Sequence, residues 1–179
     1  MRAALALMVT LLVTLMLVAC ATPLQPAQLG QTPWTSGRIS VRIEAAGPQA
    51  AQGFSAAFEL RGDSDSGELR LFSPLGSLLA AARWALGEAV LTTPQGQQRY
   101  ATLDDLSRQA LGEAVPLAAL SDWLKGRPWP AATYGATETG FEQLGWQVVL
   151  TQRAEGLIEA RRDALPRATV RVRLDDRQP

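Results

Sequence analysis

The sequence of 179 residues has no histidine and only one cysteine, and Lys125 is its one lysine. Without histidine, the usual base for a serine or cysteine nucleophile is missing and a histidine-based zinc site cannot form. The single cysteine, Cys20, excludes a disulfide within the chain. A Ser–Lys dyad remains formally possible, but Lys125 precedes Gly126 and fits a solvated cation at a helix end better. We therefore expect no enzymatic activity, no metal and no cofactor.

Charge is evenly balanced. Basic and acidic residues number 17 each, so the formal net charge is zero. Arg2 belongs to the N-terminal apolar segment, and without it 16 basic residues face 17 acidic ones. A chain with no basic excess lacks the electrostatic footprint of a nucleic-acid-binding protein. No nucleic-acid partner is expected.

The N-terminal segment combines one basic residue with an apolar run. Arg2 is followed by residues 3–19, which are almost wholly apolar and end at the small Ala19 beside Cys20. A membrane-spanning helix needs about 20 apolar residues, and this shorter run has no basic flank after it. Residues 1–19 are therefore predicted to be a signal peptide.

The junction after this segment reads Leu17-Val18-Ala19-Cys20 and matches the lipobox of bacterial lipoproteins. We predict cleavage before Cys20 and acylation of the new N-terminus, where two or more acyl chains give a stable anchor. Ala21 replaces the Asp that favours inner-membrane retention in enteric-type bacteria, so the expected location is the outer membrane, facing the periplasm. An ordinary signal peptide with a chance cysteine is the alternative.

Two further segments follow the cleavage site. Residues 20–33 contain Pro23, Pro26 and Pro33 and show no hydrophobic period, which is typical of a tether. Residues 34–179 have the length of one ordinary domain with its own core.

Most of this domain alternates apolar and polar residues with period two, the pattern of half-buried strands. Alternation without long apolar runs favours an antiparallel sheet. The predicted strands cover residues 38–44, 54–60, 68–71, 78–84, 89–92, 97–100, 145–152, 157–161 and 168–174.

A helical period interrupts the strands in the middle of the chain. Thr102 can cap a helix that ends at Gly112, and Pro116 can open a second helix that ends at Gly126. Their apolar stripes consist of Leu103, Leu106, Ala110 and Leu111 in the first helix and Leu117, Leu120, Trp123 and Leu124 in the second.

Together these elements predict a mainly β (α+β) fold. One curved antiparallel sheet would form an incomplete β-barrel, with the short helices as a lid over a hydrophobic cavity. A fully packed β-sandwich is the alternative. The inward-facing residues are candidates first for the core and second for the wall of an acyl-chain cavity: Phe54, Phe58, Leu69, Leu71, Trp84, Trp146, Val148 and Val170.

Several segments, in order along nearly the whole domain, resemble the outer-membrane lipoprotein receptor family LolB. Phe58 departs from the resemblance, because many members have tryptophan there, and residues 175–179 lack the usual late aromatic. The matching pieces are the lipobox, Trp34 with residues 37–42, and residues 68–76, 115–117, 120–128 and 145–148.

The resemblance implies both a fold and a function. Members of the family are incomplete barrels with a helical lid; they accept lipoproteins from the soluble periplasmic carrier LolA and insert them into the inner leaflet of the outer membrane, without nucleotide. Leu75 matches the exposed loop leucine that the family needs to place cargo in the membrane. The implied partners are LolA, the acyl chains of cargo lipoproteins and outer-membrane lipids, and a monomer is expected.

Three other functions are consistent with parts of the sequence. A soluble carrier of the same fold would not be permanently anchored, so the lipobox disfavours it. An outer-membrane scaffold or assembly lipoprotein would bind protein surfaces without transferring acyl chains. A lipid-processing enzyme would chemically change its substrate.

Overall fold

The structure is a computed structural model that describes residues 32–48, 50–85, 87–111 and 115–175. These residues belong to one compact unit, residues 31–179. Cys20, the predicted signal peptide, most of the predicted tether and the predicted helix end at Gly112 lie outside the described residues. Among the helices of the described ranges, none combines the length and apolar character that crossing a membrane requires.

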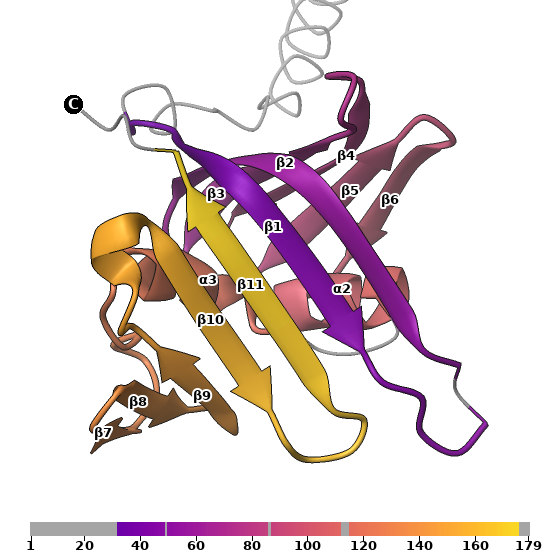
Figure 1. Ribbon diagram of the computed structural model, residues 1–179. Helices are drawn as coiled ribbons and strands as arrows, with labels where there is room; N and C mark the ends of the chain where they lie inside the picture. The colour runs from indigo at the N-terminus through magenta and orange to yellow at the C-terminus, as the bar shows by residue number, and fades with distance from the viewer. Residues whose placement is uncertain (1–31, 49, 86, 112–114, 176–179) are drawn as a thin grey trace, which may run out of the picture. The chain divides into compact units, whose positions relative to one another are not determined.

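Eleven strands make up one antiparallel sheet (Figure 1). They are β1 (Thr35–Ile43), β2 (Gln52–Gly62), β3 (Ser66–Phe72), β4 (Leu78–Ala85), β5 (Glu88–Thr93), β6 (Gly96–Tyr100), β7 (Tyr134–Thr137), β8 (Gly140–Gln143), β9 (Trp146–Val149), β10 (Leu157–Arg162) and β11 (Ala168–Leu174). Their order across the sheet is β6-β5-β4-β3-β2-β1-β11-β10-β9-β8-β7. Because β6 and β7 lie at opposite edges, the sheet curls without closing, and the predicted incomplete barrel is confirmed.

The centre of the sheet pairs the first strand of the domain with the last. Ile39 lies opposite Val172 and Val41 opposite Val170, and all four side chains are buried on the inner face. Polar residues occupy the alternate positions of both strands. The period-two pattern therefore identified the inner face correctly here.

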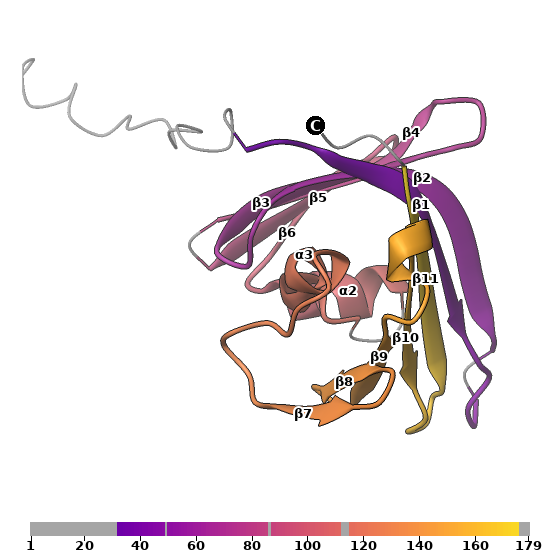
Figure 2. The same cartoon turned by 60° about the vertical axis from the view of Figure 1, so that its left-hand side comes forward.

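Both short helices lie on the concave side of the sheet (Figure 2). Helix α2 (Leu103–Leu111) begins after Thr102, whose Oγ1 accepts a hydrogen bond of 3.0 Å from the backbone N–H of Asp105, as the predicted cap requires. Helix α3 (Leu117–Leu124) follows Pro116 and buries Ala119, Leu120, Trp123 and Leu124. A 3-10 turn, η2 (Arg153–Glu155), precedes β10.

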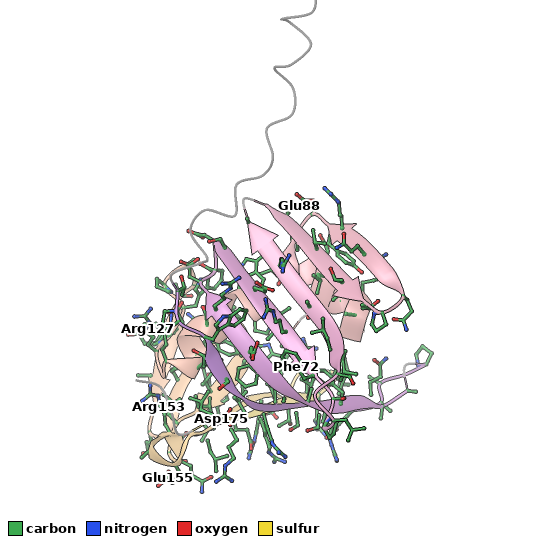
Figure 3. The ribbon with its side chains drawn as sticks, turned by 90° about the horizontal axis from the view of Figure 1, so that it is seen from above. Phe72, Glu88, Arg127, Arg153, Glu155 and Asp175 are labelled. Atoms are coloured by element: carbon green, nitrogen blue, oxygen red, sulfur yellow. The ribbon has the colours of Figure 1, made fainter. Side chains whose placement is uncertain are left out.

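Helix α3 ends where the sequence predicted. Gly126 has φ +73°, and a Cβ there would lie 2.2 Å from Nε of Arg153. Glycine therefore fits this helix C-terminus, because it tolerates positive φ and has no Cβ. The backbone carbonyl of Lys125 accepts a hydrogen bond of 2.8 Å from Nη2 of Arg153, and Arg127 Nε donates one of 2.7 Å to Asp122. Arg127 and Arg153 are labelled in Figure 3. Lys125 itself is exposed at the helix end, in agreement with the solvated-cation interpretation.

Strands β7 and β8 were not predicted. Tyr134 and Gly135 in the edge strand are exposed, so β7 has no strong alternation to detect. Gln143 in β8 is 2 % exposed and uses its whole amide: Nε2 donates to the carbonyls of Trp129 and Ala132 at 2.8 Å each, and Oε1 accepts from Trp123 Nε1 at 2.9 Å and from the backbone N–H of Trp129 at 2.8 Å. This satisfied amide ties the chain after α3 to the sheet.

The sequence pattern assigned Glu68 to a polar surface, but its side chain is 1 % exposed. Its carboxylate accepts hydrogen bonds from Arg61 at 2.7 Å, Arg70 at 2.8 Å and Arg83 at 3.1 Å. Burial acts to raise the pKa of Glu68, but these three arginines outweigh it and hold the pKa below the ordinary value of 4.5. The outer face of the sheet therefore contains a buried carboxylate covered by guanidinium groups.

Because of this carboxylate, we expect the free energy of unfolding to fall in acid. Because the pKa of Glu68 is lower in the folded chain than in the unfolded chain, its ionised form stabilises the fold fully above about pH 4.5. This stabilisation is lost progressively as the pH falls through the pKa that Glu68 has in the folded chain. Glu68→Gln should lower the free energy of unfolding on the order of 2 kcal/mol at pH 7 and flatten its dependence on pH below about 4.5.

Urea denaturation between about pH 3 and 7 measures both effects. The pKa of Glu159 is also lowered, because Arg161 and Arg171 outweigh its burial, and this group stays in both proteins. The difference between the two curves therefore isolates Glu68. Parallel curves for the wild type and Glu68→Gln would contradict the proposed ion cluster.

Candidate functional site

An apolar cavity of about 70 Å³ lies between the inner face of the sheet and the helices. Strands β1 to β4 supply one wall, and α2 with the first residues around α3 supplies the other. The lining residues are Ile39, Val41, Phe54, Leu69, Leu71, Ala80, Ala82, Leu106, Ser107, Ala110, Val115 and Leu117.

Ser107 is the one lining residue with a polar side chain. It is fully buried, and its Oγ accepts a hydrogen bond of 2.9 Å from the backbone N–H of Val115. The hydroxyl therefore joins α2 to the segment before α3. Since the remaining lining side chains are apolar, this cavity offers little to hold water.

The cavity has a closed side and a more open side. Ile39, Leu69 and Leu106 are buried, whereas Phe54 is half-buried and Ala110 on α2 is exposed. The more open side therefore lies along the second half of α2. Pockets that hold a ligand have volumes of roughly 300–1,000 Å³. This cavity has only about 70 Å³, so helix α2 packs closely on the sheet.

The predicted cavity residues fall into three groups. Phe54, Leu69 and Leu71 line this cavity. Val170 lines a separate space of about 10 Å³ beneath α3, whereas Phe58, Trp84, Trp146 and Val148 lie elsewhere in the buried core. Whether any of the eight contacts an acyl chain stays a prediction.

Sequence reasoning overlooked the residues that create the space. Ala80 and Ala82 follow the inward alternation of β4, and their short side chains leave a volume that neighbouring leucines and Phe54 do not fill. Small residues at inward positions of a strand were the available signal. The helix residues Leu106, Ala110, Val115 and Leu117 could be assigned only once the helices were placed against the sheet.

A second candidate feature is the turn between β3 and β4, which starts after Phe72 (labelled in Figure 3). Ser73 and Ser77 close it: the backbone N–H of Ser73 donates to the carbonyl of Ser77 at 2.8 Å, and the N–H of Ser77 to Oγ of Ser73 at 3.1 Å. Leu75 stands between them, 94 % exposed, followed by Gly76 at φ +80°.

This turn presents apolar surface to the solvent. Leu78 and Leu79, which begin β4, are each 45 % exposed. Because water disfavours exposed apolar side chains, three such leucines within five residues favour an apolar contact outside the domain. At 94 % exposure, Leu75 does not pack on its own barrel.

A wider hollow of about 420 Å³ lies beside β8 and β9. Polar side chains from Glu142, Gln147 and Arg161 contribute to its lining, and it is open to solvent. It therefore lacks the dry wall that an apolar ligand requires.

An open antiparallel barrel with two helices over a small dry cavity is the class of fold that these observations define. A protein-family comparison narrows this class. The family model described as "Outer membrane lipoprotein LolB" matches residues 33–176. The chain belongs to this LolB family.

Individual relatives agree with the family match. The outer-membrane lipoprotein LolB of Bordetella petrii is 36 % identical over 155 residues, which cover 80 % of this chain and 76 % of the relative. LolB of Bordetella pertussis is 36 % identical over 125 residues, 65 % of this chain and 62 % of the relative, or less than two thirds of its length. LolB of Cupriavidus metallidurans is 31 % identical over 146 residues, 75 % of this chain and 71 % of the relative.

Family membership defines location and general role. The protein is an outer-membrane lipoprotein that acts in lipoprotein localisation.

Proposed function

We propose that the protein receives lipoproteins from the periplasmic carrier LolA and inserts them into the inner leaflet of the outer membrane, holding their acyl chains in the cavity between α2 and the sheet. The dry lining of this cavity carries the proposal. Exposing an acyl chain to water costs about 0.8 kcal/mol per methylene, so a receptor must offer an apolar site. The one polar lining side chain, Ser107, is already hydrogen-bonded.

Loading requires the lid to move. The cavity of about 70 Å³ is much smaller than an acyl chain needs, so α2 must separate from β1 to β4 when cargo enters. Within α2, Leu106 and Ser107 are buried, whereas the three residues after them are exposed. A nine-residue helix held by few buried side chains opens at low cost.

Transfer can then proceed without nucleotide. Each step needs only a higher affinity at the next site, from carrier to receptor to bilayer, and differences of a few kcal/mol suffice. Leu75 would assist the last step by entering the bilayer surface, since it is 94 % exposed on a turn closed by hydrogen bonds.

A dye-displacement experiment tests this function. The purified protein is loaded with a fluorescent hydrophobic dye, and LolA carrying an acylated lipoprotein is added. The proposal predicts loss of dye fluorescence and transfer of the cargo with unchanged mass. Retained dye would favour the scaffold alternative, and a changed cargo mass would favour a lipid-processing enzyme.

The anchor predicted at Cys20 has its own test. Cys20→Ala, expressed behind a conventional cleavable signal peptide so that no leader remains, should move the protein from the membrane to the soluble periplasmic fraction. The physical reason is the loss of two or more acyl chains, which supply stable anchoring. Fractionation at high salt removes electrostatic attachment, so a variant that stays on the membrane would contradict acyl anchoring.

A further inference from the structure

The outer face of the two central strands carries a group of exposed arginines. Arg38 and Arg42 point outward from β1, and Arg171 and Arg173 point outward from β11. Arg38 lies directly opposite Arg173 in the strand register, and Arg171 lies opposite Ser40. We call these four arginines the outer arginine patch.

The patch is poorly neutralised. Arg171 donates a hydrogen bond of 2.6 Å to Glu159, but within the described ranges the side chains of Arg38, Arg42 and Arg173 make no hydrogen bond or ion pair. Like charges directly opposite in a sheet are destabilising, so the arrangement does not serve the stability of the fold.

The patch also contrasts with the neutral chain as a whole. The outward positions of β10, β11, β1 and β2 hold six arginines, because Arg61 and Arg161 join the four above, against two glutamates, Glu59 and Glu159. Helix α2, on the concave side, holds Asp104 and Asp105 beside Arg108. The balanced totals of the chain therefore include a local excess of basic side chains at the outward positions of these four strands.

The chain enters the domain on this same outer face. The ring of Trp34 stacks under the guanidinium groups of Arg61 and Arg70, with 4.4 Å and 4.5 Å from each Cζ to the ring centroid. Only residues 21–33 separate Trp34 from Cys20. Thirteen residues reach at most about 45 Å when fully extended.

We propose that the outer arginine patch binds the phosphates of anionic phospholipids in the membrane that carries the anchor, so that the helix-covered side of the domain faces the periplasm and the arriving carrier. This inference rests on the proposed anchoring at Cys20 and deepens the proposed receptor function. Guanidinium groups suit phosphates because they donate two parallel hydrogen bonds.

A bilayer fits this surface better than an acidic protein does. The tether keeps the patch within reach of lipid headgroups at all times, which gives them a high effective concentration. Each arginine near an anionic membrane strengthens binding about fivefold. Several arginines spread over adjacent strands can each bind a phosphate, because the phosphates of a bilayer move laterally to meet them.

The experiment measures which side of the domain approaches lipid. Because Cys20 is the one cysteine and is acylated in the mature protein, Ser40→Cys supplies a single thiol within the patch for a fluorophore, and Gln109→Cys on α2 supplies one on the opposite side. The full mature lipoprotein is placed in phosphatidylethanolamine vesicles with or without phosphatidylglycerol, together with headgroup-quencher lipids. Quenching at position 40 should rise with phosphatidylglycerol and fall with salt, while quenching at position 109 stays low.

Two charge variants complete the test. The patch variant combines Arg38→Gln, Arg42→Gln and Arg173→Gln, and it should reduce the quenching at position 40 at least fivefold. The control variant removes the same charge elsewhere by combining Arg108→Gln, Lys125→Gln and Arg167→Gln. It should leave the quenching at position 40 unchanged. Equal quenching at position 40 in the two variants would overturn the proposal. So would equal quenching of the wild type in vesicles with and without phosphatidylglycerol.

Cargo transfer from LolA is followed in the same vesicles. If the wild type transfers no cargo, the receptor function itself fails, whatever the quenching shows. If the patch variant keeps its quenching but accepts no cargo, the arginines bind an acidic protein and not lipid, which contradicts the proposal.

Discussion

Leu75→Glu should strongly slow the delivery of cargo into membranes while leaving the fold and cargo uptake intact. Leu75 is 94 % exposed, so the substitution removes no core contact, and exposed sites of this kind change stability by about 0.5 kcal/mol or less. Placing a carboxylate in the apolar part of a bilayer costs about 3 kcal/mol. The rate of release into vesicles should therefore fall about a hundredfold.

The chain offers a matched control for this variant. Leu165, in the turn between β10 and β11, is also strongly exposed, at 74 %. Leu165→Glu adds the same charge at another turn and should transfer cargo at the wild-type rate. Normal release by Leu75→Glu, or equal loss in both variants, would contradict a specific role for the β3–β4 turn.

Ala80→Phe should block uptake. Ala80 lines the cavity from β4, and a phenyl ring there would occupy the space of about 70 Å³ into which cargo must enter. Excluding even four methylenes of an acyl chain costs about 3 kcal/mol, or about a hundredfold in affinity. Titration of the dye-loaded protein with cargo-bearing LolA measures the effect.

Ala81→Phe is the control for this substitution. Ala81 is the next residue in β4 and lies opposite Arg70 on the outer face, so the same ring points away from the cavity. This variant should accept cargo normally, and the thermal unfolding of both proteins shows whether the fold survives. Full uptake by a folded Ala80→Phe would place the acyl site elsewhere.

The sheet could be predicted because its strands have one buried and one solvated face. That condition produces clear alternation in β1, β2 and β11, where Ile39, Leu60 and Val172 are buried between polar neighbours. The same condition fails in β7, whose edge position leaves Tyr134 exposed. It also fails at Glu68, which is buried on the outer face because Arg61, Arg70 and Arg83 cover it, and these contacts join three strands.

The candidate site was harder to predict than the fold. Large apolar residues such as Phe58 and Trp146 were the obvious candidates for a cavity wall, yet both are buried in the core and neither lines the apolar cavity. The cavity arises where side chains are short, at Ala80 and Ala82, and where α2 covers them. Volume depends on how two elements distant in sequence meet, and residue type alone does not reveal it. Leu75 is different, because a short turn exposes its side chain whatever the rest of the domain does.

The most direct test of receptor function is depletion of the protein in its own bacterium. Our account predicts that newly exported lipoproteins accumulate in the soluble periplasm, bound to LolA, and that restoring the wild-type chain, but not Ala80→Phe, returns them to the outer membrane. Arrival of lipoproteins at the outer membrane at the normal rate during depletion would contradict the account.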